Sequence, residues 1–226
     1  MGDRPVDPDA ETIETLKAVR GFVEAQAEFG LTEFRCGRAD ADARLADFHE
    51  SIRDCRLCGL CESRRSVVFG SGNPDAGLMF VGEAPGAEED RTGLPFVGAA
   101  GALLTRMIEA IGFKREDVYI ANVIKCRPPG NRDPRPEEIV TCKPFLERQI
   151  EHIQPVAICA LGLFAAQTLL ETDEPMGSLR GRIFSYRGIH LIPTYHPAAL
   201  LRNRHWKRPA WEDLQLLRRV YDNTAG

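Results

Sequence analysis

Three polar residues that could bind a ligand or take part in catalysis lie at or near the ends of predicted strands. Glu83 follows the apolar run 78–81 within Gly-Glu-Ala-Pro-Gly, where two glycines and a proline stop the strand and force a turn. Asn122 interrupts a later apolar run, and His196 closely follows another. Ligands of open α/β sheets bind at the carboxyl ends of the strands, which lie on one edge. We therefore expect Glu83, Asn122 and His196 to converge on one pocket.

These residue types suit a flat, polar ligand such as a nucleobase. The Asn122 amide offers a donor and an acceptor, so it can pair with a base edge. His196 can donate to an oxygen that gains negative charge. Phe96, on a loop between a proline and a glycine, can stack on a base. The structural alternatives are a satisfied buried amide, a turn-capping histidine and a phenylalanine that closes the core.

The cysteines indicate a metal or cluster site. The chain has 7 of them, and an odd count in an intracellular setting disfavours a disulfide framework. Cys55 and Cys58 form a chelating Cys-x2-Cys pair, while Cys126 and Cys142 flank a basic loop. A zinc ribbon prefers a second Cys-x2-Cys pair, whereas thiolates from separate loops suit an iron–sulfur cluster at least as well. Because Cys61 extends the first pair to Cys-x2-Cys-x2-Cys, either Cys58 or Cys61 could be the ligand. The alternative to a metal or cluster site is a set of free structural thiols.

Composition is ordinary for a globular protein, but the charge is uneven. The 226 residues are 43% hydrophobic and 27% charged, with a net charge of −4. Residues 1–50 carry 12 acids and 6 bases, so the remainder has a net charge of +2. Basic clusters at 125–135 and 202–208 suit a phosphate backbone, or are simply solvated surface. No apolar run is long enough to span a membrane, and an acidic, proline-rich N-terminus without a secretory signal predicts an intracellular protein.

Strands that alternate with helices predict an α/β fold: a three-layer α/β/α sandwich around a mostly parallel sheet. The expected strands are 66–69, 78–82, 117–124, 156–161, 183–186 and 189–193. The expected helices are 11–29, 41–54, 98–111, 136–152, 162–171 and 211–221, with a short helix or turn at 198–204. We expect residues 1–48 to be a partly helical extension, and 49–226 to be the core domain.

Four motifs give the chain a family resemblance. They are Gly82-Glu-Ala-Pro-Gly86, Gly93-Leu-Pro-Phe-Val-Gly98, the segment 122–134 and His196-Pro-Ala-Ala-Leu-Leu-Arg202. Together with the cysteine spacing they resemble the type 4 (family 4) uracil-DNA glycosylases, the iron–sulfur members of the uracil-DNA glycosylase superfamily, over about residues 52–221. The resemblance implies hydrolysis of the N-glycosidic bond of uracil in DNA, leaving an abasic site for base excision repair.

The resemblance also implies roles for individual residues. The implied uracil pocket consists of Gly82, Glu83, Ala84, Phe96, Asn122 and His196, with Glu83, Asn122 and His196 catalytic. The implied [4Fe-4S] cluster is held by Cys55, Cys58, Cys126 and Cys142, and Cys61 departs from the usual pattern. Expected DNA contacts are Arg127, Arg132 and Arg135 on the basic loop, and Leu200, Leu201 and Arg202 beside the flipped base. We expect a monomer that acts on single- or double-stranded uracil-containing DNA and does not bind a membrane.

Other functions stay open from the sequence alone. A related subgroup binds uracil-DNA covalently through a His in a Lys-Arg-Arg-Ile-His segment and has Gln in place of Glu83. The loop 127–134 has no His, and both departures favour a glycosylase that turns over. Two further alternatives remain. One is a non-catalytic, cluster-bearing DNA-binding module, and the other is a zinc-stabilised nucleotide-binding domain. Glu83 can act as a base toward water or as a stabilising charge.

Overall fold

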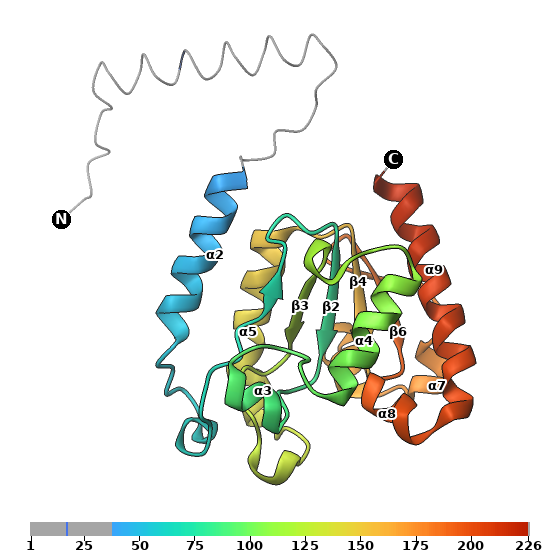
Figure 1. The fold of residues 1–226 in the computed structure, drawn as a ribbon. Helices are drawn as coiled ribbons and strands as arrows, with labels where there is room; N and C mark the ends of the chain where they lie inside the picture. The colour runs from blue at the N-terminus through green and yellow to red at the C-terminus, as the bar shows by residue number, and fades with distance from the viewer. Residues whose placement is uncertain (1–16, 18–37, 226) are drawn as a thin grey trace, which may run out of the picture. The chain divides into compact units, whose positions relative to one another are not determined.

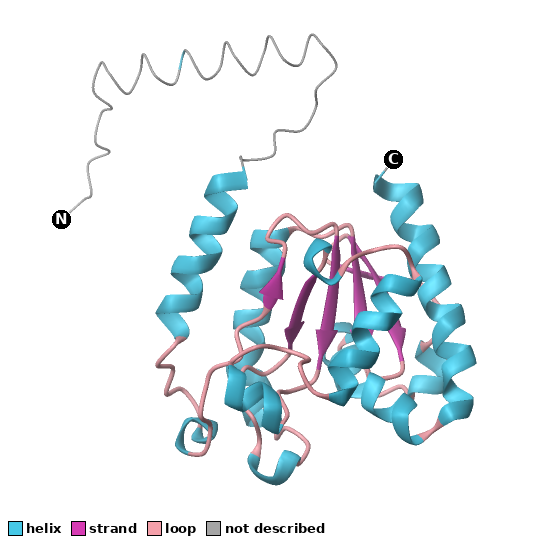
Figure 2. Cartoon of the chain, viewed as in Figure 1, coloured by secondary structure: helices cyan, strands magenta, loops and turns pink. Residues whose placement is uncertain are grey.

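A six-stranded, mostly parallel sheet forms the middle layer of this computed structural model, which describes residue 17 and residues 38–225 (Figures 1 and 2). The strands are β1 (Ser71–Gly72), β2 (Leu78–Gly82), β3 (Tyr119–Asn122), β4 (Ala157–Leu161), β5 (Phe184–Tyr186) and β6 (Ile189–Thr194). Their order is β1-β3-β2-β4-β6-β5, with β1 and β5 antiparallel to their neighbours at the two edges. The predicted α/β class is confirmed.

Helices cover both faces of the sheet. One face packs against α2 (Arg38–Ile52), α5 (Pro136–Ile153), α6 (Leu163–Leu170) and α7 (Met176–Leu179). The other face packs against α4 (Ala99–Ala110), α8 (Pro197–Arg202) and α9 (Lys207–Ala225). Helix α3 (Ala87–Thr92) and the 3-10 turns Gly59–Glu62, Arg115–Asp117, Pro129–Asn131 and Arg204–Trp206 complete the described elements. Figure 1 shows α3 and α8 at the end of the sheet toward which β2 and β3 point.

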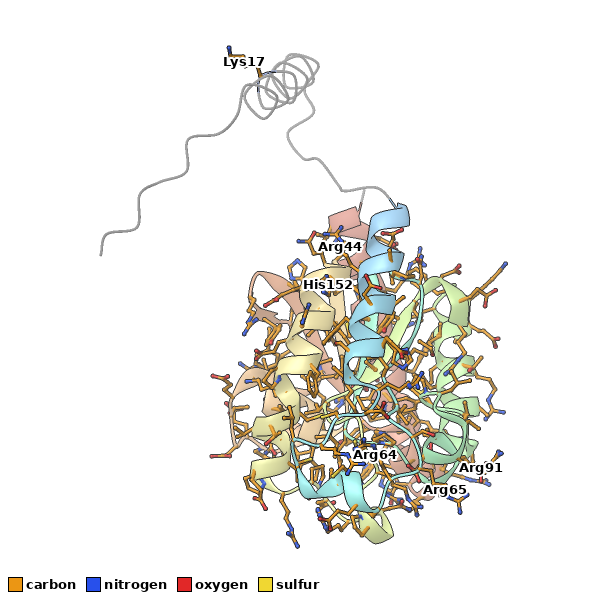
Figure 3. The ribbon with its side chains drawn as sticks, turned by 90° about the vertical axis from the view of Figure 1, so that its left-hand side faces the viewer. Lys17, Arg44, Arg64, Arg65, Arg91 and His152 are labelled. Atoms are coloured by element: carbon orange, nitrogen blue, oxygen red, sulfur yellow. The ribbon has the colours of Figure 1, made fainter. Side chains whose placement is uncertain are left out.

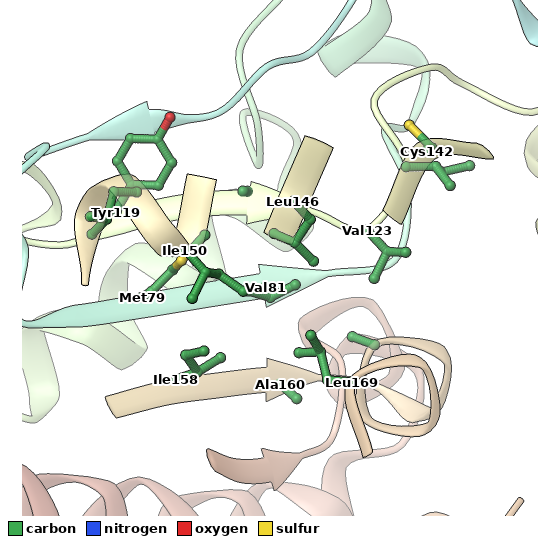
Figure 4. Close-up of a cluster of buried hydrophobic side chains, with 14 of the residues drawn as sticks. Met79, Val81, Tyr119, Val123, Cys142, Leu146, Ile150, Ile158, Ala160 and Leu169 are labelled. Carbon is green, nitrogen blue, oxygen red and sulfur yellow. The ribbon is translucent and has the colours of Figure 1, made fainter. Parts of the chain in front are cut away.

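The central strands are apolar on both sides because helices cover both faces. In β2, Met79 and Val81 face the cluster around α5 and α6, and Leu78 and Phe80 face the cluster around α4 and α9. This alternation follows the two-residue period of a strand. Figure 4 shows part of the first cluster, in which Leu146 and Ile150 of α5 lie over β2.

Helix α2 packs onto the core domain. Leu45, Phe48 and Ile52 are buried, and the Phe48 and Phe69 ring centroids lie 5.4 Å apart. Figure 3 shows the helix face-on, and it contacts α5. The compact unit begins at Arg38, so the boundary expected after residue 48 falls inside α2. The predicted helix 11–29 lies outside the described residues, apart from residue 17.

Several predicted bounds are wrong for local reasons. Residues 67–69 are buried, but the run 66–69 is not a strand, because regular pairing starts only at Ser71. Val68 donates one backbone hydrogen bond to the carbonyl of Lys125, at 2.7 Å. Helix α9 begins at Lys207, because Pro209 is tolerated in a first turn. Helices α3 and α7 are short and were not predicted. No helix among the described residues has the length and apolar content that a membrane crossing needs.

Candidate active site

A pocket of about 370 Å³ opens at the carboxyl edge of the parallel strands. Glu83 follows β2, Asn122 ends β3 and His196 follows β6, and Gly82 pairs with Asn122 in the sheet register. The structure therefore brings the three predicted polar residues together at one edge. The full lining is Glu83, Ala84, Pro85, Gly86, Glu89, Phe96, Ala100, Asn122, Pro128, Asn131, Arg132, His196, Ala198 and Arg202.

Gly82 does not line the pocket, but it permits the pocket's geometry. A Cβ atom at Gly82 would lie 2.6 Å from Cζ of Phe96 and closer still to Oδ1 of Asn122. Any side chain there would push the ring and the amide apart. Asn122 is 1% exposed, and its Oδ1 atom is one of the few buried side-chain atoms in the described part that have no hydrogen-bond partner. Asn122 therefore brings a buried amide oxygen without a hydrogen-bond partner to the wall of the pocket.

His196 is a neutral hydrogen-bond donor. Its Nδ1 atom accepts from the backbone N–H of Ala198 at 3.1 Å, which places the ring proton on Nε2. Burial lowers the pKa of His196 to about 4, with Arg202 adding to the effect and Glu89 opposing it. The imidazole is therefore neutral at physiological pH. Its ring centroid lies 5.5 Å from that of Phe96.

The Glu83 carboxyl titrates near neutrality. Burial raises its pKa to about 7, and the negative charge of Asp133 adds to the shift. Such a shift is typical of a carboxyl group prepared for proton transfer or for contact with a developing cation.

Glu89 is a lining residue that the sequence reasoning missed. Its Oε2 atom accepts from the Gly86 N–H at 3.1 Å, and its Oε1 atom accepts from Val97 and Gly98 at 3.0 and 3.2 Å. The available signal was a glutamate three residues after the helix-capping Gly86, which is a capping-box spacing. That spacing predicts the first bond but not the two bonds to the Phe96 loop.

The basic loop contains arginines in different settings. Arg132 lines the pocket and makes a bidentate ion pair with the buried Glu138, at 2.9 and 2.6 Å. Arg127 donates to Asn131 at 2.7 Å, and Arg135 is exposed at the start of α5. A loop held by these bonds presents its remaining donors in a fixed arrangement.

Lys125, at the start of that basic cluster, is buried and does not face solvent. Its ammonium donates to the carbonyl of Asn122 at 2.7 Å and to the Gln149 side chain at 2.5 Å. Gln149 in turn donates to the carbonyl of Phe69 at 2.8 Å. Lys125 therefore supports the backbone of Asn122 and contributes no phosphate contact.

Leu200 of helix α8 is buried, so it does not make the DNA contact predicted for it. Leu200 is 2% exposed and packs in the cluster with α4 and α9, so it is not available to fill a gap in DNA. Leu201 is 43% exposed, and the exposed Arg202 lines the pocket. The helical period separates Leu200 from its neighbours because successive residues point in different directions.

The four cysteines expected to bind a cluster line one small cavity, which shares no residue with the pocket at the sheet edge: Cys55, Cys58, Cys126 and Cys142. Cys61 does not line it. Cys126 accepts from Arg64 at 3.6 Å, and Cys142 accepts from the backbone N–H of Lys125 at 3.2 Å; Figure 3 marks the position of Arg64. In the described part of the chain, no three Cys, His, Asp or Glu side chains form a group that could hold a metal ion.

Comparison with known proteins decides the family. A family model described as the uracil DNA glycosylase superfamily matches residues 69–215. The chain belongs to this superfamily. It is 45% identical over 175 residues to a type-4 uracil-DNA glycosylase of Saccharolobus solfataricus, covering 74% of this chain and 81% of that protein. Type-4 uracil-DNA glycosylases of Archaeoglobus fulgidus and Thermotoga maritima are both 47% identical, covering 70% and 74% of this chain and 83% and 88% of theirs.

These relatives confirm the resemblance that the sequence motifs predicted. The superfamily match and the type-4 relatives together identify the chain as a type-4 member of the uracil-DNA glycosylase superfamily. The α/β sandwich with its pocket at the carboxyl edge of the sheet is consistent with that membership.

Proposed function

We propose that the protein removes uracil from DNA by hydrolysing the N-glycosidic bond, which leaves an abasic site in base excision repair. The family supports the class of enzyme, because the type-4 relatives are named uracil-DNA glycosylases. One observation carries the choice of base: the buried, unpartnered Oδ1 atom of Asn122 in a pocket beside the Phe96 ring.

Asn122 is suited to distinguish uracil from cytosine. Uracil presents an N3–H donor between two carbonyl acceptors, so its N3–H can satisfy the Oδ1 acceptor of Asn122. Cytosine presents an acceptor at N3, which would leave Oδ1 unpaired in a buried site. An unsatisfied buried polar group costs about 1–3 kcal/mol, which corresponds to a preference of roughly 5- to 150-fold.

His196 and Glu83 act on opposite charges of the transition state. Bond cleavage leaves negative charge on uracil and positive charge on the sugar, as in other glycosyl transfers. The Nε2–H of neutral His196 donates to the uracil O2 as that oxygen becomes anionic. Ionised Glu83 faces the sugar, where it orients water or stabilises the cation.

The surrounding residues hold DNA with its base turned out of the stack. Extruding a base costs a few kcal/mol, less for a mismatched or single-stranded uracil. Leu201 is exposed at the end of α8 and fills the space that the base leaves, next to Arg202. Arg127, Arg132 and Arg135 contact phosphates from the basic loop. We propose that the protein acts as a monomer inside the cell.

We propose that Cys55, Cys58, Cys126 and Cys142 hold a [4Fe-4S] cluster. Their side chains line one cavity, and N–H groups of Arg64 and Lys125 point at two of the sulfurs. Four cysteines that come from separate segments and line one cavity are a ligand set that an iron–sulfur cluster uses. The cluster would tie the basic loop to the segment after α2.

A uracil-containing oligonucleotide tests the function. The wild type should release free uracil and leave alkali-sensitive sites, in U·G duplexes and in single strands. Asn122→Ala and His196→Ala should lose most of this activity, and the same oligonucleotide with cytosine should stay intact. A stable protein–DNA adduct on the sugar from which uracil has left, without turnover, would instead identify a covalent binder, and intact DNA with tight binding would identify a non-catalytic module.

A further inference from the structure

The carboxylate of Glu89 joins two loops that both line the base pocket. Its Oε2 atom accepts from Gly86, which ends the loop carrying Glu83 and Ala84, at 3.1 Å. Its Oε1 atom accepts from Val97 and Gly98, directly after Phe96, at 3.0 and 3.2 Å. One side chain therefore bridges the acid side of the pocket and its aromatic side.

Phe96 needs such support because its backbone is in an uncommon conformation. Its φ is +52°, in the left-handed region that non-glycine residues rarely adopt. The carbonyl before it, on Pro95, accepts from Arg115 at 2.7 Å, and the two N–H groups after it are held by Glu89. The backbone of Phe96 also lies directly against Gly101 of α4, where any Cβ atom would collide with it.

We propose that Glu89 is a positioning residue: it fixes the loop of Phe96 relative to the loop of Glu83, and so sets the width of the slot that receives the flipped base. This inference rests on the proposed function, because the slot is assigned to uracil. The carboxylate acts through Phe96. The uncharged amide of a Gln at this position keeps one acceptor oxygen and therefore keeps only part of the bridge.

The neighbouring Glu88 offers a matched control. It lies on the same short helix, is 57% exposed and pairs with Arg91 at the surface, at 2.8 Å. Glu88→Gln removes the same charge from the same helix without touching either loop. Effects shared by Glu88→Gln and Glu89→Gln would arise from the charge of the helix. Effects confined to Glu89 arise from the bridge or from its charge beside His196, and amide exchange of the Phe96 loop separates these two causes.

The first test does not depend on activity. Hydrogen–deuterium exchange of the segment 94–103 should be roughly tenfold faster or more in Glu89→Ala, because the amides of Val97 and Gly98 lose their acceptor. Glu89→Gln should be intermediate, and Glu88→Gln should match the wild type. Unchanged exchange in Glu89→Ala would overturn the proposal. Melting curves recorded beside these measurements identify any variant that fails to fold.

The second test asks whether Glu89 acts through Phe96. Glu89→Ala should weaken binding of free uracil roughly tenfold and slow single-turnover release of uracil, while Phe96→Leu has its own larger effect. In the double variant the loss should equal that of Phe96→Leu alone, because coupled residues are non-additive. Additive losses would overturn the proposal. A wild type that neither binds nor releases uracil would overturn the proposed function, and the exchange result would still decide the bridge.

Discussion

The Nδ1 atom of His196 accepts a hydrogen bond from the backbone N–H of Ala198 at 3.1 Å. The bond serves two purposes, since it caps α8 and it fixes the tautomer of the ring. The structural role expected as an alternative for His196, a turn cap, and its chemical role are therefore compatible, because each uses a different nitrogen.

Removal of His196 should slow catalysis without changing its pH dependence. His196→Ala removes one donor to the developing oxyanion, so single-turnover release should fall roughly 10²–10³-fold. Since the pKa of His196 is lowered to about 4, the fold-loss should be the same at pH 6 and pH 8. The exposed His205 provides the control, and His205→Ala should retain the wild-type rate. A loss that changes tenfold between the two pH values would show that a charged imidazole takes part.

Activity should rise with pH through about 7. The pKa of Glu83 is raised to about 7, so its ionised form, which the reaction uses, becomes dominant only above that pH. Single-turnover rates measured from pH 5.5 to pH 8.5 should follow this titration. Glu83→Gln should be slow and flat over the same range. A sloping profile in Glu83→Gln would assign the titration to another group.

Stability should respond to Glu83 in the opposite direction. A carboxyl group whose folded pKa is raised binds its proton more tightly in the folded state, so stability falls as pH rises from about 4.5 to about 7. Glu83→Gln removes this loss. The melting temperature of the variant relative to the wild type should therefore be higher at pH 8 than at pH 4.5. An equal difference at both pH values would contradict the assignment.

Glu138 should matter to DNA binding although it lies below the loop surface. Its side chain is 7% exposed and holds Arg132, whereas that of the adjacent Glu137 is 68% exposed. Glu138→Ala should lower the free energy of unfolding by about 2 kcal/mol and weaken DNA binding about as much as Arg132→Ala does. Glu137→Ala is the control, and its affinity in a titration with labelled DNA should be at least that of the wild type.

Substitution of Cys61 and of Cys126 should have different effects on the proposed cluster. Cys61 does not line the cavity that Cys58 and Cys126 share. Protein purified without oxygen should be coloured and contain iron, Cys61→Ser should retain both properties, and Cys126→Ser should lose them. Iron analysis and visible spectra measure this directly. A colourless wild type that contains zinc would identify the zinc-stabilised alternative.

The pocket could be predicted from the sequence because the order and direction of the strands determine where its residues lie. Runs that read as parallel strands must end on one edge, so Glu83, Asn122 and His196 could be brought together without coordinates. The sequence could not separate Leu200 from Leu201, because both are apolar and only the packing of α8 against α4 distinguishes them. Lys125 was grouped with surface charge for a similar reason, since burial of an ammonium depends on partners distant in sequence.

Glu89 marks a different limit. A capping-box spacing predicts its bond to Gly86, three residues away, but its bonds to Val97 and Gly98 span a turn whose course the sequence does not reveal. Side chains that join two loops are therefore harder to recognise than side chains at strand ends.

Lys125 connects the cysteine cavity to the strand end that carries Asn122. Its backbone N–H donates to Cys142, and its ammonium holds the carbonyl of Asn122. A local opening that frees the lysine breaks its bonds to Cys142 and to the Asn122 carbonyl in one event, as members of one cooperative unit. Disruption of the cysteine cavity should therefore also disturb the backbone that positions Asn122.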